Sequence, residues 1–367
     1  SRLEFHPYGH GARARMACQV QAIRANLSKA IFGVRDPHMT AASNQVSERS
    51  WSQVPKLVFV MMTMVSVFSI AQGLSYPLLA KLLENMGYGS FAIGVSAFMT
   101  PLGLLVSGMT VSWLAKHLGA RRWGYISGLI LAISFLLIAL IQDYWLWLVL
   151  RFLIGVAIAT QFMVSETWMI SITPEAVRGR VIGLYNFMFA LAFSLGPLLL
   201  GIFGTESLLP FGIAVLLALT PTILIMVLYH QLPTWQDEST SDASPFSVLP
   251  SMLFIALVVV CVGGIDQITM TFFAPFLEQR GFSENSSYYL LWLVLKSGAL
   301  LMLVLGWLME KTNRNAIWFL LLFAGSVLPI AMLAAPSGSW IVIALGLLWG
   351  MSIMPLFVIC MLEISER

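Results

Sequence analysis

Long apolar runs, separated by short clusters of glycine, proline, asparagine and charged residues, fill most of this chain. A helix that crosses a membrane needs about 20 apolar residues, and each run reaches that length. The sequence therefore predicts an all-α polytopic membrane protein with about ten transmembrane helices. The predicted spans are residues 55–80, 90–115, 122–141, 144–173, 178–203, 207–230, 247–279, 284–309, 315–335 and 339–366.

The composition indicates that lipid is the solvent of these helices. Of the 367 residues, 59% are hydrophobic and 10% are charged, and the mean hydropathy is +0.86. A soluble domain carries about 25% charged residues. Soluble enzyme classes are therefore excluded. The chain also has neither the GxSG nor the GxGD motif of intramembrane hydrolases, so we expect that it is not an enzyme.

The cysteines predict no metal or redox chemistry. Cys18, Cys261 and Cys360 lie far apart and form no CxxC pair, which argues against a disulfide framework and a zinc site. We expect no cofactor and no metal ion.

Polar segments divide the chain into parts. We interpret residues 1–38 as preceding a native start at Met39, because they lack the apolar core of a signal peptide. The long polar segment 231–246 separates six spans from four. The predicted parts are a polar basic tail (1–54), an N-terminal six-helix half (55–230), a cytoplasmic linker (231–246) and a partial C-terminal half with four of six helices (247–367).

Short-loop lysines and arginines predict the orientation, because they stay on the cytoplasmic side of a bacterial membrane. With the N-terminus inside, only Lys81 and Arg280 are external. We expect a multi-pass protein of the cytoplasmic (inner) membrane whose partners are the lipid bilayer and a small solute, not nucleic acid. The predicted cytoplasmic residues are Lys56, Lys116, Arg121, Arg122, Arg178, Arg180, Lys311 and Arg314.

Two landmarks recur at a separation of 194 residues. The segment SWLAKHLGARR at 112–122 aligns with GWLMEKTNRN at 306–315, and the same separation relates Gly87 to Gly281. This indicates duplicated halves, an architecture of transporters with the site at the repeat interface. Because the first half has six spans and the second has four, we expect two further spans to be missing from this sequence.

The repeated loop resembles the loop between the second and third helices of the major facilitator superfamily, whose pattern is G-x-L-A-D-R-x-G-R-R. Ser112 replaces the first glycine of that pattern, Lys116 its aspartate, and Asn313 the glycine of the second copy. The resemblance implies two six-helix repeats and loops that lock the cytoplasmic side. The implied gating residues are Lys116, Gly119, Arg121 and Arg122, with Gly306, Glu310, Lys311 and Arg314 in the second copy.

The fifth span is similar to the antiporter pattern of that family. Gly183, Gly196, Pro197 and Gly201 match it, while Ala192 and Leu200 depart from it. In the family this pattern goes with export, although small residues also serve helix packing in any membrane protein. The fourth span, 150–169, is most similar to the YcaD-like bacterial subfamily.

Charges inside the bilayer mark candidate sites, because each costs about 2.5–3.5 kcal/mol on insertion scales. Asp266 and Lys296 lie at similar depths in consecutive spans. We interpret them as an ion pair that a proton or an anionic solute group could break. A static bridge is the alternative.

Two further charges lie in the fourth span. Glu166 lies near its cytoplasmic end, where we predict a gating ion pair with Arg121 or Arg122. Arg151 lies nearer the external end and could hold an anionic solute or extend toward the lipid headgroups. The polar residues that we expect around Arg151 are Gln72, Tyr185 and Asn186.

The sequence favours a secondary transporter that moves a small organic solute by alternating access. Proton-coupled efflux by a monomeric antiporter is the main prediction, and proton-coupled or facilitated uptake is the alternative. A membrane sensor or an inactive truncated copy is the rival from another class. The repeated halves disfavour a receptor, which has no physical need of them.

Overall fold

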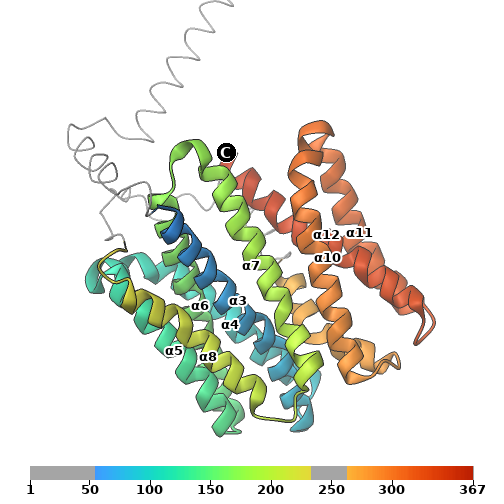
Figure 1. Ribbon diagram of the computed structural model, residues 1–367. Coiled ribbons are helices and arrows are strands. Elements are labelled where there is room, and N and C mark those ends of the chain that lie inside the picture. The colour runs from blue at the N-terminus through green and yellow to red at the C-terminus, as the bar shows by residue number, and fades with distance from the viewer. Residues whose placement is uncertain (1–53, 233–262, 367) are drawn as a thin grey trace, which may run out of the picture. The chain divides into compact units, whose positions relative to one another are not determined.

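The computed structural model describes residues 54–232 and 263–366, and every regular element in those two ranges is a helix (Figure 1). From Pro55 onward the helices belong to one compact unit. The predicted tail, the predicted linker beyond Leu232 and the first part of the seventh span lie outside the described residues. The elements are α3 (Val54–Asn85), α4 (Ser90–Leu118), α5 (Ala120–Leu140), α6 (Tyr144–Ile172), α7 (Glu175–Phe203), α8 (Leu209–Val227), a helix over 263–279, α10 (Glu284–Lys311), α11 (Arg314–Ala334) and α12 (Trp340–Glu366).

These helices follow the predicted spans closely. In the described ranges, seven helices are long and apolar enough to cross a membrane, namely α3 to α8 and α11. The other three predicted spans coincide with the helix 263–279, α10 and α12, and their crossing remains a prediction. Large apolar side chains such as Phe91, Phe319 and Trp340 point outward with 73–86% exposure, which suits lipid and not water.

The helix boundaries repeat at the predicted separation of 194 residues. The first residues of α4 and α5, Ser90 and Ala120, correspond to Glu284 and Arg314, the first residues of α10 and α11. In packing, α4 lies against α6 as α10 lies against α12. The duplication therefore reaches the helix ends and the packing of helix pairs. We call α3 to α8 the N-terminal half, and the helix 263–279 with α10 to α12 the C-terminal half.

The turns after the first helix of each half have the same backbone geometry. Gly87 and Gly281 have φ values of 85° and 89°, which glycine adopts without the steric cost of a Cβ. Tyr88 N donates to Leu83 O at 3.0 Å, and Phe282 N donates to Leu277 O at 3.1 Å. Such 6→1 bonds after a left-handed residue end many helices. We call this end of the bundle the Gly87 end, and the opposite end, where Gly119 joins α4 to α5, the Gly119 end.

Glycines let the backbones of neighbouring helices touch within each half. A Cβ at Gly155 of α6 would collide with Thr100 O of α4, and one at Gly350 of α12 would collide with Val294 O of α10. Close backbone approach is how membrane helices gain packing energy when the surrounding lipid is as apolar as their side chains. These contacts bring α4 and α6, and α10 and α12, into pairs.

The predicted packing motif of the fifth span is only partly right. A Cβ at Gly196 of α7 would meet the backbone of Gly73 and Leu74 in α3, and one at Gly201 would lie 2.9 Å from Tyr289 Cε1 of α10. Pro197 lies inside α7 beside the first of these contacts. Gly183, in contrast, faces open space, because it lies on the exposed side of α7. Its predicted packing role is therefore wrong.

Two substitutions on α7 test this packing. We expect Gly196→Ala to lower the free energy of unfolding by about 1–3 kcal/mol, because overpacking forces the backbones apart. Gly183→Ala is the matched control on the same helix and should be neutral or slightly stabilising, since alanine favours helix over glycine. Thermal melting of the two variants in detergent measures the difference. Equal melting temperatures would contradict the close α3–α7 contact.

Candidate functional site

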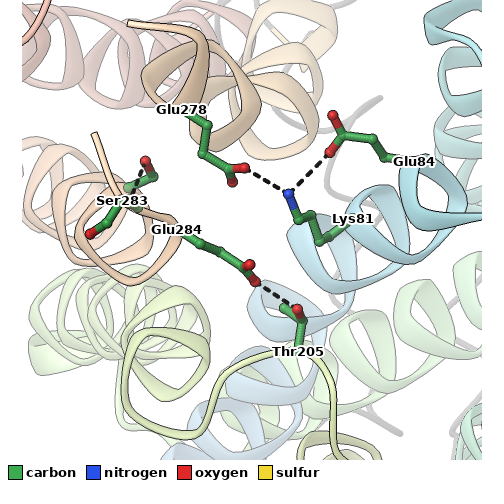
Figure 2. A network of polar contacts seen from close by, with 7 residues as sticks. Lys81, Glu84, Thr205, Glu278, Ser283 and Glu284 are labelled. Carbon is green, nitrogen blue, oxygen red and sulfur yellow. Dashed lines mark hydrogen bonds and ion pairs between the residues drawn. The ribbon is translucent and has the colours of Figure 1, made fainter. Parts of the chain in front are cut away.

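A network of polar side chains joins the two halves at the Gly87 end (Figure 2). Lys81 of α3 extends its Nζ to Glu278 Oε2 of the helix 263–279 at 2.6 Å and to Glu84 Oε2 of its own helix at 3.4 Å. Nearby, Thr205 Oγ1 donates to Glu284 Oε1 of α10 at 2.6 Å. We call these five residues the polar seam.

The two glutamates that share Lys81 occupy equivalent positions of the duplication. Glu84 and Glu278 are 194 residues apart, and each accepts through its carbonyl oxygen the hydrogen bond of the glycine that follows, Gly87 or Gly281. The position equivalent to Lys81 is Pro275, which carries no charge. One cation thus serves two related carboxylates. Because the Lys81 side chain is only 13% exposed, the pair is screened less than a surface ion pair.

A second polar cluster lies deeper between the helices. Gln72 Nε2 donates to the Tyr76 hydroxyl at 3.2 Å, one turn along α3. The guanidinium of Arg151 and the carboxyl group of Asp266, in the other half, lie in the neighbourhood of the Tyr76 hydroxyl. Gln72 and Asp266 are again related by 194 residues. The equivalent positions of the two halves therefore present an amide and a carboxyl toward a shared region.

Arg151 is the least compensated charge of this cluster. Its residue is 1% exposed, and Nη1 donates to Ser96 Oγ of α4 at 3.2 Å. Within residues 54–232 and 263–366, Nε and Nη2 have no hydrogen-bond partner. In the described part of the chain no carboxylate forms an ion pair with it. The alternative in which Arg151 extends to the headgroups is inconsistent with this burial.

Two of the predicted neighbours of Arg151 lie elsewhere. The Tyr185 hydroxyl is 2.6 Å from Ser165 Oγ, which is 14 residues beyond Arg151 on α6, or about 21 Å along the helix axis. Asn186 follows Tyr185 on α7 and is half-buried. The prediction was wrong for both residues because the sequence did not reveal the axial register of α7 against α6. Gln72 stays near Arg151 through Tyr76.

The predicted ion pair between Asp266 and Lys296 is not formed. Lys296 Nζ lies 4.7 Å from the centroid of the Trp292 ring, one turn back on α10. Similar depth in consecutive helices does not fix the rotation of each helix about its axis, and here the cation faces an aromatic ring of its own helix. Asp266 is half-buried on the helix 263–279.

The predicted gating pair at the Gly119 end is also not formed. Arg121 Nη2 donates to Leu232 O, and its guanidinium lies 5.3 Å from the centroid of the Tyr229 ring. Glu166 is half-buried on α6 and has no ion pair with Arg121 or Arg122. Arg121 therefore fastens the start of α5 to the segment after α8, while Arg122 is exposed.

The remaining predicted residues of the loop motif lie on both sides of Gly119 and in its second copy. Gly119 has φ 85° and separates α4 from α5, so it supplies the turn that the motif needs. The side chains of Lys116, Glu310, Lys311 and Arg314 lie outside the described structure, as does the surrounding of Gly306. Their gating roles remain predictions. Across the described ranges, no three His, Cys, Asp or Glu side chains gather as a metal site.

The comparison with protein families identifies the chain. A model of the Major Facilitator Superfamily matches residues 61–367. The chain belongs to the Major Facilitator Superfamily. The resemblance of the chain to that superfamily is thereby confirmed, and the curated relatives that it matches are named as MFS-type transporters.

Curated relatives support the same placement. The chain is 25% identical over 197 residues to the uncharacterized MFS-type transporter YfkF of Bacillus subtilis (strain 168), covering 53% of this chain and 50% of YfkF. It is 26% identical over 255 residues to the uncharacterized MFS-type transporter YcaD of Escherichia coli (strain K12 / DH10B), covering 68% of this chain and 65% of YcaD. The likeness to YcaD is as predicted. The chain thus spans between half and two thirds of these relatives.

Solved structures show the major-facilitator fold. The nucleoside transporter NupG superposes with a TM-score of 0.67 at 14% identity, covering 85% of this chain and 82% of NupG. A D-xylose-proton symporter superposes with a TM-score of 0.65 at 13% identity, covering 86% of this chain and 83% of the symporter. The predicted all-α fold of two related halves is confirmed.

Sequence reasoning missed Glu84, Glu278, Tyr76 and Ser96. The sequence marks Lys81 only as an external charge, and Tyr76 and Ser96 carry no charge that would distinguish them from other hydroxyl residues. The separation of 194 residues was a usable signal, because it aligns Glu84 with Glu278 and Gln72 with Asp266.

Replacing the two neighbouring arginines tests the contact at the Gly119 end. Arg121→Ala should lower the free energy of unfolding by about 1.5 kcal/mol, because it removes a charged hydrogen bond to the backbone. Arg122→Ala removes an exposed arginine of the same charge and should change the melting temperature little. If Arg122→Ala is the more destabilising variant, the assignment of the two side chains is wrong.

Proposed function

We propose that this protein is a secondary transporter that moves a small organic solute across the cytoplasmic membrane by alternating access, as a monomer that exports the solute in exchange for protons. The observation that carries the proposal is the polar seam. Among the described residues, one ion pair and one hydrogen bond join the halves at the Gly87 end. Polar contacts of this kind separate at low cost when water can replace them, so the seam is suited to reversible closure.

The shared lysine supplies a route for opening. In the closed seam Lys81 is 2.6 Å from Glu278 and 3.4 Å from Glu84. When the halves move apart, Lys81 remains paired with Glu84, which lies three residues away on the same helix. The Glu278 carboxylate then becomes hydrated. The lysine therefore never loses both of its partners. This exchange reduces the energy difference between the closed and open states, which lets a bound solute change their populations.

The distribution of basic residues supports an orientation for this gate. Short-loop cations are concentrated at the Gly119 end, and Lys81 and Arg280 are near the Gly87 end. By the positive-inside rule the Gly119 end is cytoplasmic. The structure then corresponds to a state with a closed external seam, in which Arg121 and the loop motif belong to the cytoplasmic side.

Asp266 is the candidate for proton coupling. It is a carboxyl group inside a membrane helix without an ion-pair partner in the described ranges, and such groups mark proton pathways in transporters. Lys296, held over Trp292, is a second coupling candidate. Export is favoured by the pattern of α7. Uptake would use the same gate in the opposite direction, so only a directional assay separates the two.

Labelling of a buried cysteine tests alternating access. Ser75→Cys places a thiol on α3 at a position that is 3% exposed, about 9 Å deeper than Lys81. The background replaces Cys18, Cys261 and Cys360 with serine. We expect Glu278→Gln to speed labelling by an impermeant maleimide applied outside, about fivefold for a loss of about 1 kcal/mol.

Glu84→Gln is the matched control for that experiment. It removes the partner that Lys81 keeps in the open state, so it should slow labelling. Equal effects of the two glutamine variants, or no effect of either, would contradict the exchange of partners and the gate.

Proton coupling is tested in proteoliposomes that hold a pH-sensitive dye. We expect added organic solutes to drive proton movement through the wild type, and Asp266→Asn to abolish it, because an amide cannot carry a proton. The sign of the pH change separates export from uptake. A wild type that moves no proton, or an Asp266→Asn variant as fast as the wild type, would overturn proton coupling at this residue.

A further inference from the structure

Arg151 has an unused hydrogen-bonding edge inside the N-terminal half. Its Nη1 is bound to Ser96, while Nε and Nη2 have no hydrogen-bond partner among the residues that the structure describes. Nε and Nη2 lie on the same side of the planar guanidinium group, where their two N–H bonds point in parallel. This is the edge that binds a carboxylate with two hydrogen bonds.

A structural role does not account for this edge. The residue is 1% exposed, so water does not compensate the charge, and removal of a partner from a buried charge is strongly destabilising. The acidic groups of the middle of the bundle do not supply the partner, because neither Asp266 nor Glu166 forms an ion pair with Arg151. A buried cation without a counter-ion indicates that the counter-ion arrives from outside the chain.

The position of Arg151 relates it to the gate. It lies seven residues from the start of α6, which is about 10 Å from the Gly87 end. Lys81 lies four residues from the end of α3, about 6 Å from the same end. Arg151 is therefore the first deeply buried cation below the polar seam, and opening of the seam would admit a solute toward it.

Residues near Arg151 offer contacts to parts of a solute other than its charged group. The Tyr76 hydroxyl lies in the neighbourhood of the guanidinium, and it accepts a hydrogen bond from Gln72 Nε2. Gln72 Oε1 is buried, and no donor from the described part of the chain reaches it. A solute with a carboxylate and a nearby hydroxyl or amino group would supply a partner for both orphaned groups.

We propose that the Nε and Nη2 edge of Arg151 is the binding site for the carboxylate of a small organic acid, which is the solute class that the protein transports. This rests on the proposed transport function. In the absence of solute the unpaired charge destabilises the closed state, and carboxylate binding compensates it.

The test measures the melting temperature of the purified protein with sodium benzoate and with benzamide, an uncharged molecule of similar shape, at matched ionic strength. We expect benzoate, and not benzamide, to raise the melting temperature of the wild type, because a ligand of the folded state stabilises it. Arg151→Met should weaken the apparent affinity at least about tenfold, since both charged hydrogen bonds are lost. Arg151→Lys keeps the positive charge but lacks the two parallel N–H donors, so it should bind benzoate with intermediate affinity.

The melting temperature without ligand separates binding from structure. Arg151→Met should melt at or above the wild-type temperature, because an uncompensated buried charge is removed. Arg122→Met, at an exposed arginine, is the matched control and should keep the benzoate response. The proposal is overturned if benzoate leaves the wild type unchanged, if it stabilises Arg151→Met equally, or if Arg151→Met melts well below the wild type while Arg151→Lys does not bind benzoate.

The cysteine-labelling test uses no carboxylate, so the two proposals fail separately. A responsive gate with no benzoate effect would remove the solute class and leave alternating access in place. A benzoate effect with an unresponsive gate would keep the carboxylate site and remove the gating role of the polar seam.

Discussion

A charge inside an apolar helical bundle needs a partner, and the placement of these partners organises this protein. Lys81 lies between two glutamates, and Arg280 donates to the carbonyl oxygens of Ala335 and Leu333 that end α11. Arg121 donates to Leu232 O, and Lys296 lies over Trp292. Each of these contacts ties two segments together or keeps a cation on its own helix. Arg151 is the exception in the interior, and its orphaned edge is therefore the part of the structure that most needs a functional explanation.

The duplication places related side chains opposite one another, and the differences between the halves carry the asymmetry that the proposed transport needs. Glu84 and Glu278 are preserved, but Lys81 has the uncharged counterpart Pro275. One cation between two equivalent carboxylates can bind either, which is a simple basis for two states of similar energy. Likewise Gln72 and Asp266 are equivalent, yet only Asp266 can carry a proton. In the proposed transport cycle, the two states follow from the symmetry of the halves and the proton coupling from the departures from that symmetry.

Much of the fold could be predicted from the sequence, because a membrane helix satisfies its own backbone and must be apolar over a known length. The positions of α3 to α8 follow from that local constraint, and the separation of 194 residues follows from sequence landmarks that recur in the two halves. The candidate site was predicted less well. Arg151 and Gln72 could be identified because polar groups stand out in apolar runs. Tyr185 and Asn186 were wrongly predicted near Arg151, because the sequence does not determine the axial register of α7 against α6. The pairs of Asp266 with Lys296 and of Glu166 with the loop arginines failed because equal depth leaves the rotation of each helix undetermined.

The sequence by itself determined that lipid is the solvent, where the helices run, that the halves are related, and which superfamily the chain resembles. These properties depend on local composition and on the spacing of residues along the polypeptide chain. Only the tertiary structure decided which side chains meet. The contact of Lys81 with Glu278 joins residues 197 positions apart. Among the described residues Arg151 has no counter-ion, and this depends on how the neighbouring helices pack around it. Rotation and axial shift of packed helices set those distances, and both are fixed by close contacts such as that of Gly196 with α3, which exist only once the helices have come together.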